Sequence, residues 1–150
     1  MEKASKENHV GKIAVRAAGV LVTDGRILLV NHRKHGRSYW VLPGGHADFG
    51  EPLRDALVRE MKEELSLDVT VGPLLLVHEF LAEDVHVVNH AFRVETKSAE
   101  FRVKPDKVLK DARWIPLDEL DAVELLPPIA RELRKAVENP PTNTLYLGAV

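Results

Sequence analysis

The chain contains no cysteine, and aromatic residues make up only 5% of its 150 residues. The absence of cysteine excludes disulfide bonds, thiolate nucleophiles and thiolate metal sites. It agrees with the reducing environment of the cytoplasm, where we expect the protein to act. No apolar run is long enough to span a bilayer, and the polar residues 1–11 lack the apolar core of a signal peptide. We therefore expect no membrane contact.

An excess of charge of either sign is also missing. The sequence has 21 Lys and Arg against 23 Asp and Glu, which gives a net charge of −2. This balance provides no basic surface for nonspecific binding, so we expect no nucleic-acid partner. The length and the 45% content of hydrophobic residues are typical of one folded unit with its own core. We expect a single domain over residues 1–150, with residues 1–11 flexible and residues 139–150 forming a C-terminal tail.

The pattern of apolar and turn-forming residues predicts an α+β fold. Asp24-Gly25 between two apolar segments indicates a hairpin. Residues 32–38 are basic and residues 96–110 are polar, and both read as loops. The predicted strands cover residues 13–22, 27–31, 69–81, 85–95 and 112–116, and the predicted helices begin at about Pro52, Leu117 and Pro127.

The helix after Pro52 carries acidic residues on the side that should pack. Three acids, Glu60, Glu63 and Glu64, fall within or beside the apolar sector of a helical wheel. Exposed like-charge pairs at this spacing cost roughly 0.2–0.5 kcal/mol each, and burial raises that cost. A divalent cation would offset the repulsion, and clustered carboxylate oxygens suit Mg²⁺ or Mn²⁺. The alternative is a solvent-exposed face of Glu and Lys, which the wheel position disfavours.

The same stretch resembles the signature of the Nudix hydrolases. Gly45, Glu51, Arg59-Glu60 and Glu63-Glu64 reproduce every charged position of that signature at its spacing. The chain departs at Ser66, where the signature has a glycine. A left-handed helix exit there would cost a non-glycine residue about 1 kcal/mol. The resemblance implies an α/β/α sandwich with a mixed central β-sheet.

The resemblance also implies an activity, which is Mg²⁺-dependent hydrolysis of the phosphoanhydride bond of a nucleoside diphosphate derivative, with Mn²⁺ as the alternative ion. ADP-ribose, nucleotide sugars, dinucleoside polyphosphates and nucleoside triphosphates all carry this bond. The implied metal ligands are the Gly44 carbonyl, Glu60, Glu63 and Glu64. The alternative is a non-catalytic Nudix-like module that binds or senses a nucleotide. A module freed from catalysis would be expected to lose acids, and here all of them are present, which favours the enzyme.

Further roles follow from the resemblance. Arg59 would pair with Glu51 and brace the loop against the helix. Glu60, Glu63 or an acid from residues 96–110 would take a proton, and in that loop Asp106 and Glu100 are the candidates. Dimers are common among relatives, so the resemblance admits a homodimer. From its chemistry alone, Arg33 or Arg37 is a candidate for binding substrate phosphates, since arginine forms forked bonds to phosphate oxygens.

Overall fold

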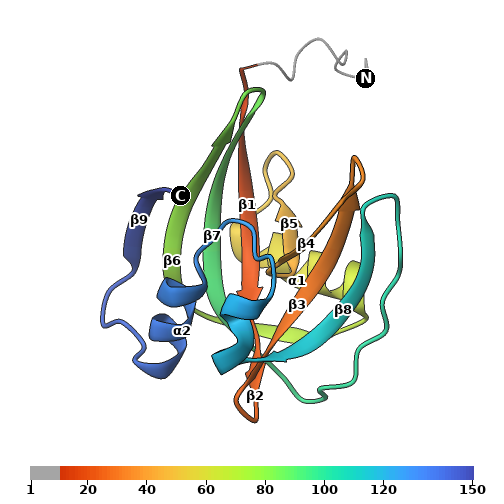
Figure 1. The fold of residues 1–150 in the computed structure, drawn as a ribbon, viewed down its shortest axis with the longest axis vertical. Helices are drawn as coiled ribbons and strands as arrows, with labels where there is room; N and C mark the ends of the chain where they lie inside the picture. The colour runs from red at the N-terminus through yellow and green to blue at the C-terminus, as the bar shows by residue number, and fades with distance from the viewer. Residues whose placement is uncertain (1–10) are drawn as a thin grey trace.

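The computed structural model describes residues 11–150, so the predicted flexible start falls almost entirely on residues 1–10, outside the described residues. Nine strands and three helical segments follow one another in this part of the chain (Figure 1). The strands are β1 (Ile13–Val20), β2 (Val22–Thr23), β3 (Arg26–Lys34), β4 (Arg37–Val41), β5 (Gly44–His46), β6 (Val69–Ala82), β7 (Val85–Thr96), β8 (Leu109–Pro116) and β9 (Leu145–Ala149). The helical segments are α1 (Leu53–Leu65), the 3-10 helix η2 (Leu117–Ala122) and α2 (Ala130–Glu138). None of these helices is long and apolar enough to cross a membrane.

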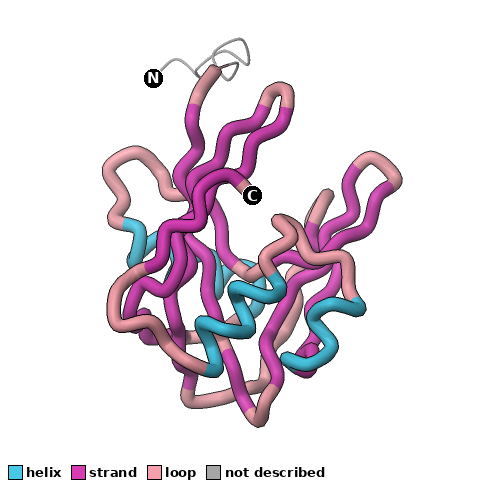
Figure 2. The backbone as a smooth tube through the Cα atoms, turned by 60° about the vertical axis from the view of Figure 1, so that its left-hand side comes forward, coloured by secondary structure: helices cyan, strands magenta, loops and turns pink. Residues whose placement is uncertain are grey.

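The strands form two sheets. The larger has the order β5-β1-β7-β6-β9 and is mixed, because β1 pairs with β7 and β6 pairs with β9 in parallel while the other pairs are antiparallel. In the smaller, antiparallel sheet, β3 pairs with β2, β4 and β8. The predicted α+β fold with a mixed sheet and helices on both sides is confirmed (Figure 2).

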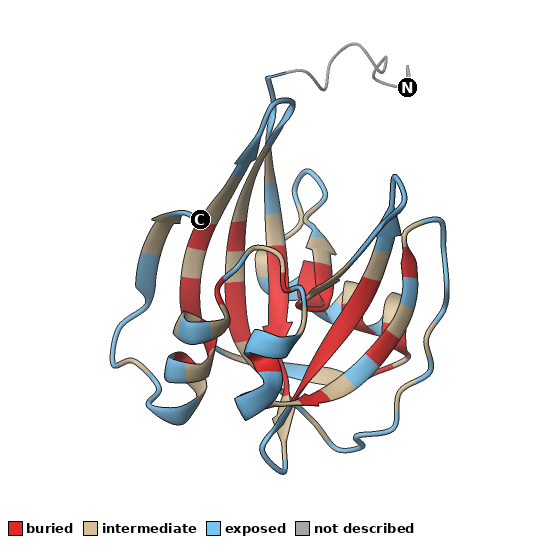
Figure 3. Ribbon diagram, in the orientation of Figure 1, coloured by how far each residue is buried: buried red, intermediate tan, exposed pale blue. Residues whose placement is uncertain are grey.

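Two groups of buried side chains hold the layers together. On one side of the sheets, Leu57 and Met61 of α1 pack with Ala17 and Phe92 of the larger sheet. On the other side, the second group includes Leu133 of α2. The buried segments include the second half of β1 and more than half of β3 (Figure 3). The apolar sector predicted for the first helix is confirmed, and burying each such side chain contributes roughly 1.5–3 kcal/mol.

In each of two tight hairpins, a non-glycine residue and the glycine that follows it both have positive φ. Asp24 and Gly25, at φ 52° and 72°, connect β2 to β3 as predicted. The prediction of a loop over residues 32–38 was wrong, because β3 continues to Lys34 and His35-Gly36 turns the chain into β4 at φ 52° and 73°. This hairpin projects from the sheet, so its basic side chains stay solvated while its backbone groups pair across the two strands.

Helix α1 ends in the left-handed geometry that the signature glycine would favour. Ser66 has φ 56° and ψ 31°, and its N–H bonds to the Lys62 carbonyl while the Leu67 N–H bonds to the Met61 carbonyl. These two bonds satisfy carbonyls of the last helical turn. Ser66 therefore adopts this exit at the cost that a Cβ imposes there.

The last part of the chain adds an edge strand. Helix α2 begins at Ala130, three residues after the predicted start at Pro127, since the chain first makes a turn in which the Ile129 N–H bonds to the Pro127 carbonyl. The tail then pairs as β9 in parallel with β6. The tail therefore belongs to the larger sheet.

Candidate active site

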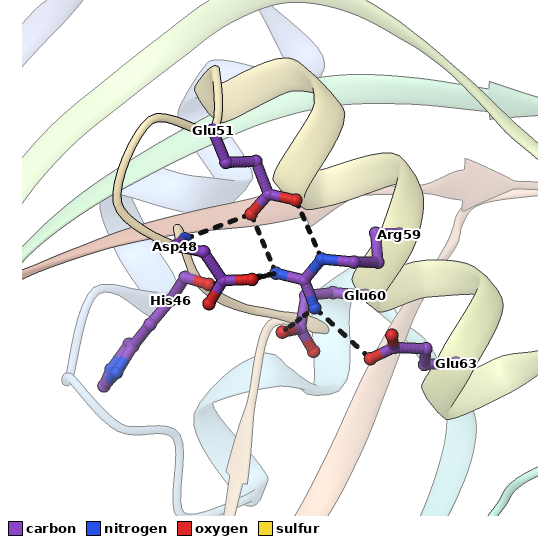
Figure 4. Close-up of polar contacts among 6 residues, drawn as sticks. All are labelled: His46, Asp48, Glu51, Arg59, Glu60 and Glu63. Carbon is purple, nitrogen blue, oxygen red and sulfur yellow. Dashed lines mark hydrogen bonds and ion pairs between the residues drawn. The ribbon is translucent and has the colours of Figure 1, made fainter. Parts of the chain in front are cut away.

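Arg59 is the centre of a hydrogen-bonded network between the loop after β5 and helix α1 (Figure 4). Its guanidinium makes a forked pair with Glu51, at 2.8 Å from Nε to Oε2 and 2.9 Å from Nη2 to Oε1. It also donates to the carboxylates of Glu60 at 2.9 Å and Glu63 at 3.3 Å, and to the His46 carbonyl. The predicted pairing of Arg59 with Glu51 is present and fastens the loop to the helix.

This pairing changes the acidity of Glu51. The hydrogen bonds from Arg59, assisted by one from the Asp48 N–H, lower the pKa of Glu51 to about 2. The same bonds raise the pKa of Arg59. Both groups therefore remain charged at every pH at which the protein would be used.

Two glycines of β5 let the chain approach its neighbours closely. Gly44 has φ 148°, and a Cβ there would overlap the backbone of Ala17. A Cβ on Gly45 would overlap the carboxylate of Glu60. The strand therefore needs glycine at position 45 so that the carboxylate of Glu60 can lie against it.

Glu64 faces Glu60 from the next turn of α1. Its Oε2 is buried and has no hydrogen-bond partner in the described part of the chain. Burial and the neighbouring charge of Glu60 raise the pKa of Glu64 to about 8, while Arg16 and a backbone hydrogen bond from Gly44 act in the opposite direction. An orphaned carboxylate oxygen beside a second carboxylate is the environment that a divalent cation would stabilise.

Glu63 differs from the other two acids. Its side chain is 60% exposed and reaches Arg59, whereas that of Glu60 is 16% exposed. The expectation of three inward-facing acids is thus correct for Glu60 and Glu64 and is corrected for Glu63, which lies at the rim. Over residues 11–150, no three His, Asp or Glu side chains already converge as a metal cage.

The two acids predicted in the loop between β7 and β8 have other surroundings. Asp106 Oδ1 accepts hydrogen bonds of 2.7 Å from the N–H groups of Val108 and Leu109, which lower its pKa and fix a turn before β8. Glu100 is exposed and lines a hollow with Ser66 beyond the C-terminal end of α1. The structure gives Asp106 a structural task and brings Glu100 to no acid of the helix.

A cleft of about 440 Å³ lies between the strands of the two sheets. We call it the intersheet cleft, and its walls include Arg16, Tyr39, Val41, Phe80, Val87 and Pro127. Arg37 also borders it and forms an ion pair with Glu124. Arg33 is exposed and does not line it, because side chains alternate along β3 and its neighbours His32 and Lys34 point to the cleft instead.

Arg16 is a site residue that the sequence did not reveal. From β1 it donates to the Leu42 carbonyl at 2.7 Å and to Asn89 Oδ1 at 3.3 Å. Burial lowers its pKa, while the charges of Glu64 and Glu60 act in the opposite direction, so it lies near both acids and also lines the cleft. The only hint in the sequence was that Arg16 is a charged residue within an apolar strand. A charged residue at such a position is equally typical of a side chain that faces solvent.

Comparison with known proteins gives a consistent result. A Methanocaldococcus jannaschii protein named ADP-ribose pyrophosphatase is 32% identical over 71% of this chain and 64% of its own, so the chain spans slightly less than two thirds of that relative. Phosphatase NudJ of Escherichia coli K12 is 27% identical over 79% of this chain and 78% of its own.

Solved structures agree with this result. The MutT NUDIX hydrolase from Burkholderia pseudomallei is 31% identical with a TM-score of 0.68, over 87% of this chain and 99% of that chain. The E. coli ORF135 protein shares the fold, with a TM-score of 0.75 at 24% identity over 88% and 96% of the two chains. A family model described as NUDIX domain matches residues 13–139. This match confirms the predicted resemblance, and the chain belongs to the Nudix hydrolase family.

Proposed function

We propose that the protein hydrolyses a phosphoanhydride bond in a nucleoside diphosphate derivative and that it needs Mg²⁺, for which Mn²⁺ can substitute. The observation that carries this proposal is the buried Glu64 oxygen without a partner in the described part of the chain, which lies one turn of α1 from Glu60. A pair of carboxylates arranged in this way costs stability unless a cation joins it. A binding module would have no reason to retain that cost.

Glu60, Glu64 and the Gly44 carbonyl would hold the metal, and Glu63 would join them from the rim. When bound, the metal lowers the pKa of a water and neutralises charge on the diphosphate. These donors are hard oxygens, which fits a magnesium ion better than a softer one.

The residues of the chain itself do the positioning. Arg59, held by Glu51, keeps the loop after β5 and the Glu60 carboxylate at fixed places. Glu63 is exposed at the rim, where it can take a proton from an attacking water when it leaves Arg59. Arg16 sets a fixed positive charge between the acids and the intersheet cleft. Together these groups support displacement at phosphorus with the nucleoside in the cleft.

The relatives support a small nucleotide as substrate. The M. jannaschii relative is named for ADP-ribose, and it is 32% identical to this chain over 110 residues. We infer that this chain acts on free cytoplasmic nucleotides. ADP-ribose, nucleotide sugars, dinucleoside polyphosphates and nucleoside triphosphates remain the substrates to compare.

A panel of these four substrate types with Mg²⁺, followed by phosphate or nucleotide release, tests the proposal. We expect hydrolysis of at least one type, its loss in excess EDTA and its return with Mg²⁺ or Mn²⁺. Glu64→Gln should lower kcat/KM at least hundredfold, whereas the matched control Glu100→Gln should leave it within twofold. Undiminished turnover by the Glu64→Gln variant, or no turnover of any member by the folded wild type, would overturn the proposal.

A further inference from the structure

Three polar side chains lie side by side across the larger sheet, and we call them the polar row. Strand register pairs Arg16 of β1 with Asn89 of β7, and Asn89 with His78 of β6. Paired residues on neighbouring strands project from the same face, so the three side chains form one line. The polar row continues from the partly exposed Arg16 to Asn89, 6% exposed, and His78, 2% exposed.

The polar row marks the inner end of the intersheet cleft. Two residues further along the same face, Phe80 and Val87 line the cleft. In the other direction the face is closed by the buried residues Ala18, Leu76 and Ala91. A smaller cavity of about 10 Å³ adjoins His78, and Arg16, Asn89, Leu126 and Pro127 line both spaces. This cavity has room for one water and joins His78 to the cleft.

The hydrogen bonds of the polar row are incomplete in a defined way. Arg16 can only donate, so its bond to Asn89 fixes Oδ1 toward Arg16 and turns the Nδ2 donor away from it. Asn89 lines the intersheet cleft, where a ligand can accept from this donor. Neither ring nitrogen of His78 has a partner over residues 11–150. Leaving the two buried ring nitrogens unpaired destabilises the protein, so their arrangement favours a water or ligand that pairs with them.

We propose that the polar row reads the carbonyl edge of a nucleobase and thereby selects uracil, guanine or hypoxanthine over cytosine and adenine. This inference rests on the proposed function, because it places the nucleoside in the intersheet cleft. Arg16 and the Asn89 amide present neighbouring donors, which pair with a carbonyl oxygen and repel an exocyclic amino group. Tyr39, Phe80 and Val87 supply apolar walls for a planar ring.

His78 acts behind Asn89. Burial lowers the pKa of His78 to about 4, so the ring is neutral near pH 7 and offers one donor and one acceptor. Through one water in the small cavity, it completes the pairing of the base on the side away from Arg16. A phosphate in place of the base would pair with Arg16 and the Asn89 amide but would leave the acceptor nitrogen of the neutral His78 ring without a donor. The composition of the row therefore favours a base.

Equilibrium binding of nucleoside monophosphates in EDTA tests this inference without requiring catalysis. UMP and CMP have the same charge and differ only in the base edge, as do IMP and AMP. By isothermal titration calorimetry we expect UMP and IMP to bind at least tenfold more tightly than CMP and AMP. Affinities within threefold in both pairs would overturn the inference, and so would tighter binding of the amino bases.

Variants of Asn89 test whether this side chain recognises the base. Asn89→Asp keeps the shape and exchanges the free donor for an acceptor, so the ratio of UMP to CMP affinity should fall at least tenfold. Asn89→Leu removes the donor without adding an acceptor and should lower the ratio, although Arg16 keeps part of the preference, which keeps the test decisive where the Asp variant does not fold. An unchanged ratio in a folded variant, shown by its melting temperature, would overturn the inference. An equal loss of UMP and CMP affinity in Arg16→Met would assign Arg16 to phosphate and would also overturn it.

The two proposals fail separately. Base discrimination in EDTA together with no turnover of any substrate would refute the hydrolase and leave the polar row as a reader. Turnover without discrimination would refute the reader and leave the hydrolase.

Discussion

The helix site around Arg59 and the polar row of the larger sheet are built in opposite ways. The helix site takes its residues from one short stretch, where turns of α1 place Glu60 and Glu64 together. The polar row takes Arg16, His78 and Asn89 from three strands that are far apart in the sequence. A spacing along one helix can be read directly from a sequence, whereas a row across strands depends on register.

We expect the largest effect on activity from a substitution at Gly45, where the backbone of β5 lies against the Glu60 carboxylate. In Gly45→Ala the new Cβ would displace the Glu60 carboxylate, since the two would overlap. We expect kcat/KM to fall at least hundredfold, measured by nucleotide release with saturating Mg²⁺. The control is Gly25→Ala, where a Cβ meets no atom within 4 Å; its φ of 72° makes the change cost stability, but the folded variant should retain activity. Near wild-type activity in Gly45→Ala would show that catalysis does not depend on the position of the Glu60 carboxylate.

Weakening the pair between Arg59 and Glu51, which fastens the loop after β5 to α1, should have a smaller effect on activity. Arg59→Lys retains the charge but loses the forked pair with Glu51, so the loop is held less firmly. We expect kcat to fall about tenfold to hundredfold, with KM changed less, in steady-state kinetics. A change confined to KM would show that the pair serves substrate binding and not alignment.

His78 of the polar row should make the free energy of unfolding depend on pH. The pKa of His78 is about 4 in the fold against its usual 6.5, so the unfolded chain takes up the proton first as the pH falls. This histidine's stabilising effect is complete above pH 6.5 and is lost toward pH 4. Between pH 7 and 5 the wild type should lose about 2 kcal/mol more than His78→Gln in urea unfolding. Equal losses in the two proteins would mean that the fold does not lower the pKa of His78.

The smallest effect is expected at the helix exit. Ser66→Gly removes a Cβ from a residue at φ 56° and should stabilise the protein by up to about 1 kcal/mol. For a chain of this size this corresponds to a rise of about 2–4 °C in Tm, read by differential scanning fluorimetry. Activity should not change, because the side chain of Ser66 lies outside both sites. A lower Tm would show that the bond from Ser66 Oγ to the Arg102 carbonyl matters more than the strain.

The sequence predicted the parts that depend on local order. The acid spacing on α1, the pairing of Arg59 with Glu51 and the Asp24-Gly25 turn follow from residues that are neighbours along the chain. The family is confirmed, whereas the catalytic and metal-binding roles stay predictions.

The parts that depend on distant residues were missed. The exposed position of Glu63 at the rim, within reach of Arg59, cannot be read from a helical wheel. The hairpin at His35-Gly36 was hidden because its strands carry charged residues in place of apolar ones. Arg16 could not be assigned to a site until the register placed it beside Asn89.

The parallel pairing of β9 with β6 has a practical consequence. Without residues 145–149, the outer edge of β6 would present unpaired N–H and C=O groups to other molecules, as exposed edges do in aggregating proteins. Tyr146 fastens this strand through its hydroxyl, which donates to Glu79. Trimming the end of the gene to shorten the protein would therefore reduce its solubility, even though that strand lies apart from the Arg59 network.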